Sequence, residues 1–352
     1  MKIGIDISPL KTGNFLQHRV RGTGFYLENL KASLLSYYPE NKYIFFTRGE
    51  KLPNDIDIIH YPYFEPFFLT LPLFSKNKTV VTIHDLTPLV FPDHFKSGLK
   101  GNLRWRIQKL ALKNASAIIT DSESSKKDII KYVDVDSAKV KVVYLAAGSG
   151  FKKLEAGSWK QEIKEKYNLP DYFALYVGDA TWNKNLPRLI ESTIKANVPL
   201  VMVGKALADE VVDSQNPWNS DLVKAHRLAA ENKNILRLGF VSNQDLIRLY
   251  NLATVFIMPS IYEGFGLPAL EAMSCGCPVI TSKGGSLKEV VGEAGKFVDP
   301  NDANSIAMGI GEVFNNTELQ KVLSQKGLVQ AKKFAWKKTV EQTMEIYNSV
   351  AR

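Results

Sequence analysis

The most constraining stretch of this chain is residues 254–300, which read TVFIMPSIYEGFGLPALEAMSCGCPVITSKGGSLKEVVGEAGKFVDP. Its apolar beginning, residues 254–258, predicts a buried parallel strand that ends at the next proline. A turn with two glycines follows, and Pro268 is typical of the first turn of a helix because its fixed φ suits that position. We expect the helix to end near Cys275, before a second strand at residues 279–281.

Strand, glycine turn and helix N-terminus in this order predict an anion-binding site. The N–H groups of Phe265, Gly266 and Leu267 should face a ligand, and the helix dipole favours negative charge there. Glu263 and Gly264 lie in the turn, and a second acid lies in the first turns of the helix. Acidic side chains accept hydrogen bonds from sugar hydroxyls, whereas they repel phosphates. A nucleotide-diphosphate sugar fits both the anion site and the acids, since its diphosphate lies between two hydroxyl-bearing rings.

Glu263 and Glu271, with GFGLPAL between them and CGCPVI shortly after, resemble the signature of retaining glycosyltransferases of family four. The resemblance implies the GT-B fold, in which two Rossmann-like, doubly wound α/β domains face a cleft that holds the active site. It also implies that Glu263 binds hydroxyls of the transferred sugar and that Glu271 binds those of the ribose. Two such acids alone would be explained as surface residues, and the glycines and prolines around them favour the family.

Alternating strand and helix patterns run along the whole chain and predict parallel sheets. The expected strands lie at residues 2–7, 43–47, 57–60, 79–83, 117–120, 141–145, 173–177, 200–203, 235–238, 255–258, 279–281 and 296–298. Residues 146–170 lose the pattern and predict a linker. We therefore expect an acceptor-side domain at 1–168 and a nucleotide-sugar domain at 169–335. By resemblance, the last helix, within 336–352, packs back on the first domain.

Composition narrows the class of protein. The chain of 352 residues is 45% hydrophobic and 23% charged, as soluble globular proteins are, and its formal charge is +9. No run approaches the roughly 18 apolar residues of a membrane span, and the first residues predict a strand rather than a signal peptide. No nucleic-acid motif accompanies the positive charge, which favours phosphorylated substrates or an anionic membrane surface. We expect a cytoplasmic protein that contacts the inner face of the membrane, with Cys275 and Cys277 as free packing residues.

Two motifs of the first domain point to the site. The strand at 79–83 leads into His84, which resembles the family histidine that lies by the transferred sugar; a purely structural histidine is the alternative. Gly22 and Gly24, in RGTGFYLENL, resemble the glycine loop that approaches the donor phosphates. Without the resemblance, an ordinary loop-to-helix turn explains these glycines equally well.

Two further segments suggest an acceptor or membrane contact. The aromatic stretch at 61–77 includes Tyr63 and Phe64, and its alternative is an irregular loop packed on its own domain. The helix predicted at 99–113 has apolar residues on one face, flanked by basic residues that include Arg104 and Arg106. That helix is either an ordinary solvated helix or one attracted to anionic lipids, at about 1 kcal/mol for each basic residue.

The second domain supplies the remaining donor contacts. Gly178 and Lys184 lie in the turn after the strand at 173–177, and Lys184 resembles the lysine that neutralises the donor diphosphate. Many relatives carry an arginine in this turn, where the present chain has Asp179 and Asn183. Lys205, after the next strand, is a candidate replacement.

Two later turns complete the predicted donor site. Phe240 and Val241 resemble the segment beside the nucleotide base. The glycine turn at 284–285 is equally well explained by a structural and a ligand-facing role.

No metal ion or other cofactor is expected, because Lys184 and the helix N-terminus would take the role of the cation. Two Asp-x-Asp strings, at 55–57 and 134–136, are predicted to be surface acids because neither follows a strand. The resemblance thus implies retaining transfer of a hexose, with mannose favoured, to a glycan or lipid-linked acceptor in the synthesis of a surface polysaccharide or glycolipid. A GT-B hydrolase, epimerase or phosphorylase, or a non-catalytic nucleotide-sugar-binding subunit, stays open as an alternative.

Overall fold

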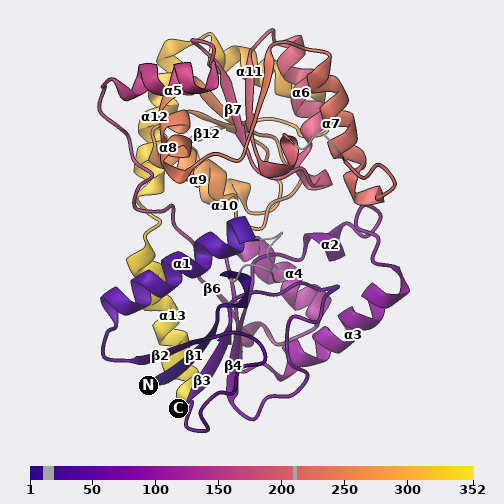
Figure 1. Ribbon diagram of the computed structural model, residues 1–352, viewed down its shortest axis with the longest axis vertical. Coiled ribbons are helices and arrows are strands. Elements are labelled where there is room, and N and C mark those ends of the chain that lie inside the picture. Colours follow the sequence, from indigo (N-terminus) through magenta and orange to yellow (C-terminus); the bar gives the residue numbers. More distant parts are fainter. Residues whose placement is uncertain (11–19, 209–211) are drawn as a thin grey trace. The chain divides into compact units, whose positions relative to one another are not determined.

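The computed structural model describes residues 1–10, 20–208 and 212–352. The chain divides into two compact units. Unit 1 comprises Met1–Ala146 and Phe334–Arg352, and unit 2 comprises Ala147–Lys333. Each unit contains a six-stranded sheet with helices on both faces (Figure 1). The predicted α/β class with two doubly wound parallel sheets is therefore confirmed.

The sheet of unit 1 has the order β2-β1-β3-β4-β5-β6, and all its strand pairs are parallel. Its strands are β1 (Lys2–Asp6), β2 (Lys42–Phe46), β3 (Ile58–Tyr61), β4 (Lys78–Ile83), β5 (Ala117–Thr120) and β6 (Val140–Val142). Its helices are α1 (Val20–Tyr37), α2 (Thr87–Val90), α3 (Gly98–Asn114), α4 (Glu123–Val133) and α13 (Trp336–Ala351), with short 3₁₀ turns η1 (Ser8–Leu10) and η3 (Ser137–Lys139). Parallel neighbours require crossover connections, which explains the alternation of strand and helix.

The two faces of this sheet are built differently. Ile59 and Val81 join one apolar cluster with residues of α3 and α4. Alternate residues of the same strands point to the opposite face, where His60 Nδ1 lies 2.6 Å from the hydroxyl of Tyr347 on α13 and His60 Nε2 lies 2.8 Å from Thr82 Oγ1. The C-terminal helix thus packs, together with α1, on the sheet of unit 1 (Figure 1).

The sheet of unit 2 has the order β12-β11-β10-β7-β8-β9, again with parallel pairs. Its strands are β7 (Ala174–Val177), β8 (Leu200–Val203), β9 (Ile235–Gly239), β10 (Val255–Met258), β11 (Val279–Thr281) and β12 (Gly295–Phe297). The chain runs from β7 to one edge, then returns to β10 and continues to the other edge. Ligands of such sheets bind beyond the carboxyl ends of the strands at this reversal, here between β7 and β10.

Helices cover both faces of the second sheet (Figure 1). They are α5 (Trp159–Tyr167), α6 (Leu186–Lys195), α7 (Ser220–Ala230), α8 (Asn243–Leu252), α9 (Leu267–Ser274), α10 (Leu287–Val291), α11 (Ala303–Phe314) and α12 (Thr317–Ala331), with 3₁₀ turns η4 (Trp182–Lys184), η5 (Lys205–Leu207) and η6 (Pro217–Asn219). The predicted strands are present, with ends that differ by a few residues, and helices alternate with them as expected. The helix predicted at 99–113 is α3, and the helix expected to end near Cys275 is α9.

The predicted domain boundary at 168/169 lies too far along the chain. Residues 147–168, which include α5, belong to unit 2. Leu154 N donates to Asn251 Oδ1 of α8 at 2.8 Å, and the Tyr167 hydroxyl donates to Asp245 Oδ2 of the same helix at 2.8 Å. The segment also packs through the buried side chains of Phe151 and Ile163 and through the ion pair of Lys166 with Asp245, contacts between distant residues that the sequence pattern does not show.

Candidate functional site

The candidate donor site of unit 2 is built from the two turns at the sheet's reversal. Gly178 and η4 follow β7, and residues 259–266 follow β10 and lead into α9. Because β7 and β10 are neighbouring parallel strands, their carboxyl ends lie side by side. The predicted strand–turn–helix is therefore placed next to the predicted lysine turn, although 79 residues separate Lys184 from Glu263.

Hydrogen bonds from the first turn hold the second in place. Asn183 Nδ2 donates to the carbonyl of Tyr262 at 2.9 Å, and Ile261 N donates to the carbonyl of Asn183 at 2.8 Å. Asn185 Nδ2 donates to the carbonyl of Pro259 at 3.0 Å. Asn183, which stands where an arginine was expected, is buried and thus clamps the turn instead of providing a charge.

Lys184 and Glu263 form a two-pronged ion pair at this point. Lys184 Nζ lies 2.9 Å from Oε1 and 2.8 Å from Oε2 of Glu263. Their side chains are only 17% and 8% exposed, so the pair is screened less than a surface ion pair. The structure thus brings together the two residues predicted to bind the donor diphosphate and the transferred sugar.

The glycine turn at 284–285 supports the backbone of Glu263. Ser286 N and Ser286 Oγ both donate to the carbonyl of Glu263, at 3.0 and 3.1 Å. Gly285 has φ +63°, and a Cβ there would lie 2.2 Å from that same carbonyl oxygen. A Cβ on Gly284 would lie 2.1 Å from the carbonyl oxygen of Ile261. Both glycines therefore have a structural role, since side chains would displace the turn that carries Glu263.

Helix α9 begins at the turn and carries the second acid. Gly266 precedes it with φ +90° and ψ 41°, a left-handed conformation that favours glycine. Glu271 is buried, and the Tyr250 hydroxyl of α8 donates to its Oε2 at 3.0 Å. Tyr250 was not predicted, because nothing in the sequence shows which side of α8 faces α9. Phe265 is also buried, and Gly264 lies beside it in the turn.

The other predicted donor residues of unit 2 lie along the neighbouring strands. Gly178 N donates to the Val203 carbonyl at 3.0 Å. Lys205 begins η5, just beyond the end of β8, and its side chain is exposed. Phe240, after β9, is 71% exposed, whereas Val241 is buried. The exposed Phe240 ring leaves a base-stacking role open, while a direct role of the Val241 side chain would need the segment to move.

On unit 1, His84 follows β4 directly and lies beside Asp121. Ile83 pairs with Thr120 in the sheet, so the next residue of each strand is a neighbour. His84 Nδ1 lies 2.7 Å from Asp121 Oδ2. Asp121 was not predicted as a site residue, although both strand ends were; the parallel register would have revealed the pair.

The two glycines predicted to lie in a loop of unit 1 belong to a helix instead. Helix α1 begins at Val20, so Gly22 and Gly24 lie in its first turns and not before it. Gly22 is exposed and a Cβ there would meet no atom within 4 Å, whereas Gly24 is buried. Glycine is unfavourable in a helix by about 1 kcal/mol, which is why the sequence placed the start later; packing of α1 on the sheet outweighs that cost. The preceding part of the predicted loop, residues 11–19, lies outside the described residues.

Tyr63 and Phe64, predicted to contact an acceptor or membrane, are both buried in unit 1, which favours the alternative of a loop packed on its own domain. The loop that carries them is fixed by Gln108 of α3, which is fully buried. Gln108 Oε1 accepts hydrogen bonds from Thr70 N and Leu71 N, both at 2.8 Å. Aromatic residues in a loop are compatible both with burial in their own domain and with a contact to a ligand or membrane. The sequence did not show that Gln108 fixes this loop by hydrogen bonds.

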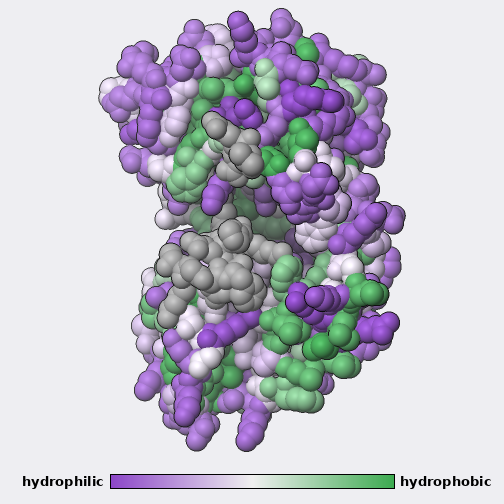
Figure 2. All heavy atoms as spheres, turned by 45° about the vertical axis from the view of Figure 1, so that its right-hand side comes forward, coloured by the Kyte–Doolittle hydropathy of each residue, from purple (hydrophilic) through white to green (hydrophobic). Residues whose placement is uncertain are grey.

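Apolar side chains other than Tyr63 and Phe64 are exposed on unit 1, several of them on α3. Leu99, Leu103 and Leu110 of α3 are 91%, 60% and 57% exposed. We call the following group the basic–apolar face: Leu73, Phe74, Leu99, Leu103 and Leu110, with Lys100, Arg104 and Arg106, all of them exposed. Figure 2 shows hydrophobic side chains gathered on the part of unit 1 that carries α3.

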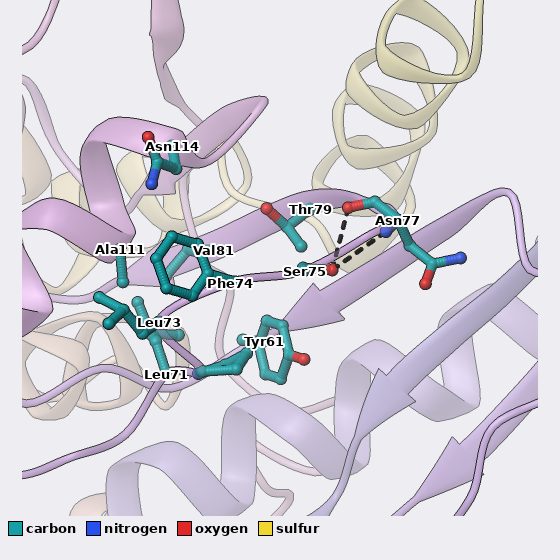
Figure 3. Close-up of a pocket in the computed structure, with 11 residues that line it drawn as sticks. Tyr61, Leu71, Leu73, Phe74, Ser75, Asn77, Thr79, Val81, Ala111 and Asn114 are labelled. Atoms are coloured by element: carbon teal, nitrogen blue, oxygen red, sulfur yellow. Dashed lines mark hydrogen bonds between the residues drawn. The ribbon is translucent and has the colours of Figure 1, made fainter.

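A pocket of about 160 Å³ adjoins this face. Leu71, Leu73 and Phe74 gather there beside Val81 of β4 and Ala111 of α3 (Figure 3). The pocket lies along the body of β4, whereas His84 follows the end of that strand. Its lining contains none of the residues predicted to bind the donor.

The remaining predictions concern acids and thiols. Asp55 and Asp134 are exposed and pair with Lys2 and Lys113, as expected of surface acids. Within residues 1–10, 20–208 and 212–352, no His, Cys, Asp and Glu side chains form a group of three that could hold a metal ion. Both cysteines are free and buried, as predicted.

Comparison with known proteins identifies the family. Residues 12–146 match the model of Glycosyltransferase Family 4, and residues 158–329 match Glycosyl transferases group 1. O-antigen chain mannosyltransferase B of Escherichia coli is 32% identical over 77% of this chain and 70% of its own length. Serotype-specific mannosyltransferase WbdA of the same organism is 30% identical over 76% of this chain, which spans 33% of that longer protein.

A solved structure supports the same assignment of the fold. Anabaena Alr3699/HepE in complex with UDP and glucose aligns with a TM-score of 0.74 at 17% identity and covers 99% of both chains. In the described part of the chain, no helix is both long and apolar enough to span a bilayer. The two family matches and the two doubly wound sheets show that this chain belongs to the group 1 and family 4 glycosyltransferases, with the GT-B fold.

Proposed function

We propose that this chain transfers a hexose, with mannose favoured, from a nucleotide-diphosphate sugar to an acceptor hydroxyl, with retention of configuration and without a metal ion. The observation that carries the proposal is the largely buried pair of Lys184 and Glu263 at the reversal of the second sheet. Ligands of such sheets bind at this point. The names of the Escherichia coli relatives support mannose, and we expect GDP-mannose as the donor and a glycan or lipid-linked acceptor.

Each group at this point matches one part of the donor. The Lys184 ammonium and the N-terminus of α9 stabilise the charge that grows on the leaving diphosphate as its bond to the sugar breaks. Glu263 accepts hydrogen bonds from hydroxyls of the transferred sugar. Glu271, held by Tyr250, accepts hydrogen bonds from the ribose. On unit 1, His84 is proposed separately to contact a sugar.

The test is a transfer assay in EDTA. Purified protein is given GDP-mannose, with UDP-glucose for comparison, and a panel of mannose-terminated free and lipid-linked glycosides. Nuclear magnetic resonance of the product then shows the configuration of the new bond. Transfer with retention in EDTA supports the proposal. An inverted product, or transfer that needs Mg²⁺ or Mn²⁺, contradicts it.

We also propose that the basic–apolar face contacts an anionic membrane, in place of the buried Tyr63 and Phe64. Residues 94–114 contain six lysines and arginines and no acid. Exposed leucines beside these cations are typical of helices that lie in the interface of a membrane. A peripheral position at the inner face of the cytoplasmic membrane would bring the protein to lipid-linked acceptors.

Replacement of Arg104 and Arg106 by alanine should weaken binding to vesicles that contain phosphatidylglycerol by about 30-fold, or about 2 kcal/mol. Cosedimentation with vesicles measures this. The matched control removes two exposed charges of unit 2, Lys326 and Lys332. An equal loss in both variants, or equal wild-type binding to neutral phosphatidylcholine vesicles, contradicts a specific role of this face.

A further inference from the structure

The ends of β4 and β5 place a histidine beside a carboxyl group. His84 Nδ1 and Asp121 Oδ2 are 2.7 Å apart, and their side chains are 22% and 3% exposed. The ring of Tyr26, from α1, lies edge-on to the His84 ring with 4.9 Å between their centroids. The ion-pair contact and the packed ring fix the imidazole in one orientation.

The second nitrogen of His84, Nε2, and the second carboxylate oxygen of Asp121, Oδ1, are buried and form no hydrogen bond of normal geometry among the described residues. The backbone of Pro62 lies near enough to His84 to favour its protonated form. Buried polar groups are nearly always hydrogen-bonded in folded proteins. A donor and an acceptor of one pair that both lack a normal partner indicate that a ligand can supply them. Sugar hydroxyls match these two atoms because each hydroxyl both donates and accepts.

We propose that Asp121 is a positioning residue that holds His84 as an imidazolium, with one proton on Nδ1 toward Asp121 and the other on Nε2 toward a sugar oxygen. His84 then acts as a hydrogen-bond donor and not as a base. The identity of the ligand as a sugar rests on the proposed function, whereas the charge state of His84 does not.

The groups around His84 support this charge state. Burial lowers the pKa of His84, but the charge and hydrogen bond of Asp121, aided by Asp85 and by a hydrogen bond to the Pro62 backbone, raise it by more, so that the pKa is higher than that of an ordinary histidine. Burial raises the pKa of Asp121. The positive charge of a protonated His84 acts in the opposite direction and lowers it. His60, on the neighbouring strand, is neutral because burial lowers its pKa to about 3. Burial raises the pKa of Tyr26, which is therefore neutral too.

The raised pKa also links the pair to folding. A histidine that binds its proton more tightly in the folded state adds stability at low pH. The contribution is complete below about pH 6.5, the ordinary pKa of histidine, and is lost as the pH rises through the folded pKa. The stability of unit 1 should therefore decrease over that range.

The experiment is a pH titration of the full chain, labelled with ¹⁵N and ¹³C in histidine and followed by nuclear magnetic resonance. His84→Gln assigns the His84 signals among the five histidines. The wild-type His84 should titrate above pH 6.5. Asp121→Asn retains an acceptor for Nδ1–H but removes the charge, and His84 should then titrate below pH 6.5, because burial remains as the main influence. Asp85→Asn, the control for a neighbouring charge, should shift the midpoint less.

A wild-type midpoint at or below 6.5 overturns the proposal, whether or not the variants fold, and so does an equal midpoint in Asp121→Asn. The pH profile of kcat/KM gives a second readout. We expect activity to decline as the pH rises through the midpoint of His84, and Asp121→Asn should move that decline to lower pH. An activity that rises over this range shows that His84 acts as a base and overturns the proposal. Absence of any transfer would contradict the proposed function alone, because the titration needs no substrate.

Discussion

Replacement of Lys184 by methionine should lower kcat/KM about 10²- to 10³-fold, the usual effect of removing one group that stabilises charge in a transition state. Methionine keeps much of the length of the side chain and removes only the cation. Lys184 has this importance because the expected second cation of its turn is absent: Asn183 clamps the backbone of Tyr262 instead. Kinetics with the donor identified by the transfer assay measure the effect, and an unchanged melting temperature shows that the fold is intact.

Glu263→Gln tests the same ion pair from the other side. In the free protein the Glu263 carboxylate neutralises Lys184 from 2.8 Å. Its removal should let Lys184 attract a diphosphate more strongly, so that nucleoside diphosphate binds roughly tenfold more tightly, or about 1.4 kcal/mol. Transfer should nevertheless decrease, because an acceptor for the sugar hydroxyls is lost. If this variant weakens nucleotide binding as Lys184→Met does, the pair has a structural role only.

Lys205→Met tests whether Lys205 replaces the arginine that many relatives carry in the turn of Lys184. Lys205 is exposed beyond the neighbouring strand β8. If Lys205 replaces that arginine, its loss should lower nucleotide affinity by a factor comparable to that of Lys184→Met. An unchanged affinity assigns the diphosphate to Lys184 and the helix N-terminus.

Gly285→Ala should destabilise unit 2 by about 3 kcal/mol and abolish donor binding. A left-handed conformation costs an ordinary residue about 1–2 kcal/mol, and overpacking adds about 1–3 kcal/mol. Here the added Cβ would lie 2.2 Å from the Glu263 carbonyl oxygen, so the turn that carries Glu263 must move. Denaturant unfolding and calorimetric titration with the nucleotide measure the two effects.

The matched control is Gly311→Ala, in α11. A Cβ at this position meets no atom within 4 Å, and its φ is not positive. Alanine in a helix is favoured over glycine by about 1 kcal/mol, so this variant should be slightly more stable and bind the donor normally. A Gly285→Ala variant as stable as the wild type would show that the contact with the turn is easily relieved.

The sequence contains most of the fold because its strands are short, mostly apolar runs separated by helical patterns, and the central strands β3, β5, β7, β8 and β10 are fully buried. The donor half of the site was also predictable, since Glu263, Gly266 and Glu271 lie in one continuous strand–turn–helix. The role of Lys184 was predicted from the family resemblance. The strand order then explains why Lys184 lies beside Glu263.

What the sequence did not reveal depends on contacts between distant segments. The orientation of Tyr250 toward Glu271 and the clamp of Gln108 on the 70–71 backbone are set by how helices pack. That packing also buried Phe64, whose aromatic ring would suit a surface contact equally well. The pairing of His84 with Asp121 is different, since the register of two predicted strands contains it.

The most direct test of the donor site is a calorimetric titration in EDTA of the wild type and of Glu271→Gln with GDP, UDP, ADP and inorganic pyrophosphate. The account predicts that one nucleotide binds the wild type at a ratio of one to one. At a hundredfold excess over its Kd, that nucleotide should stabilise the fold by about 2.7 kcal/mol. Glu271→Gln should weaken this nucleotide but not pyrophosphate, which has no ribose. Failure of every nucleotide to bind in EDTA, or equal binding to both proteins, would contradict the placement of the donor at Glu263–Glu271.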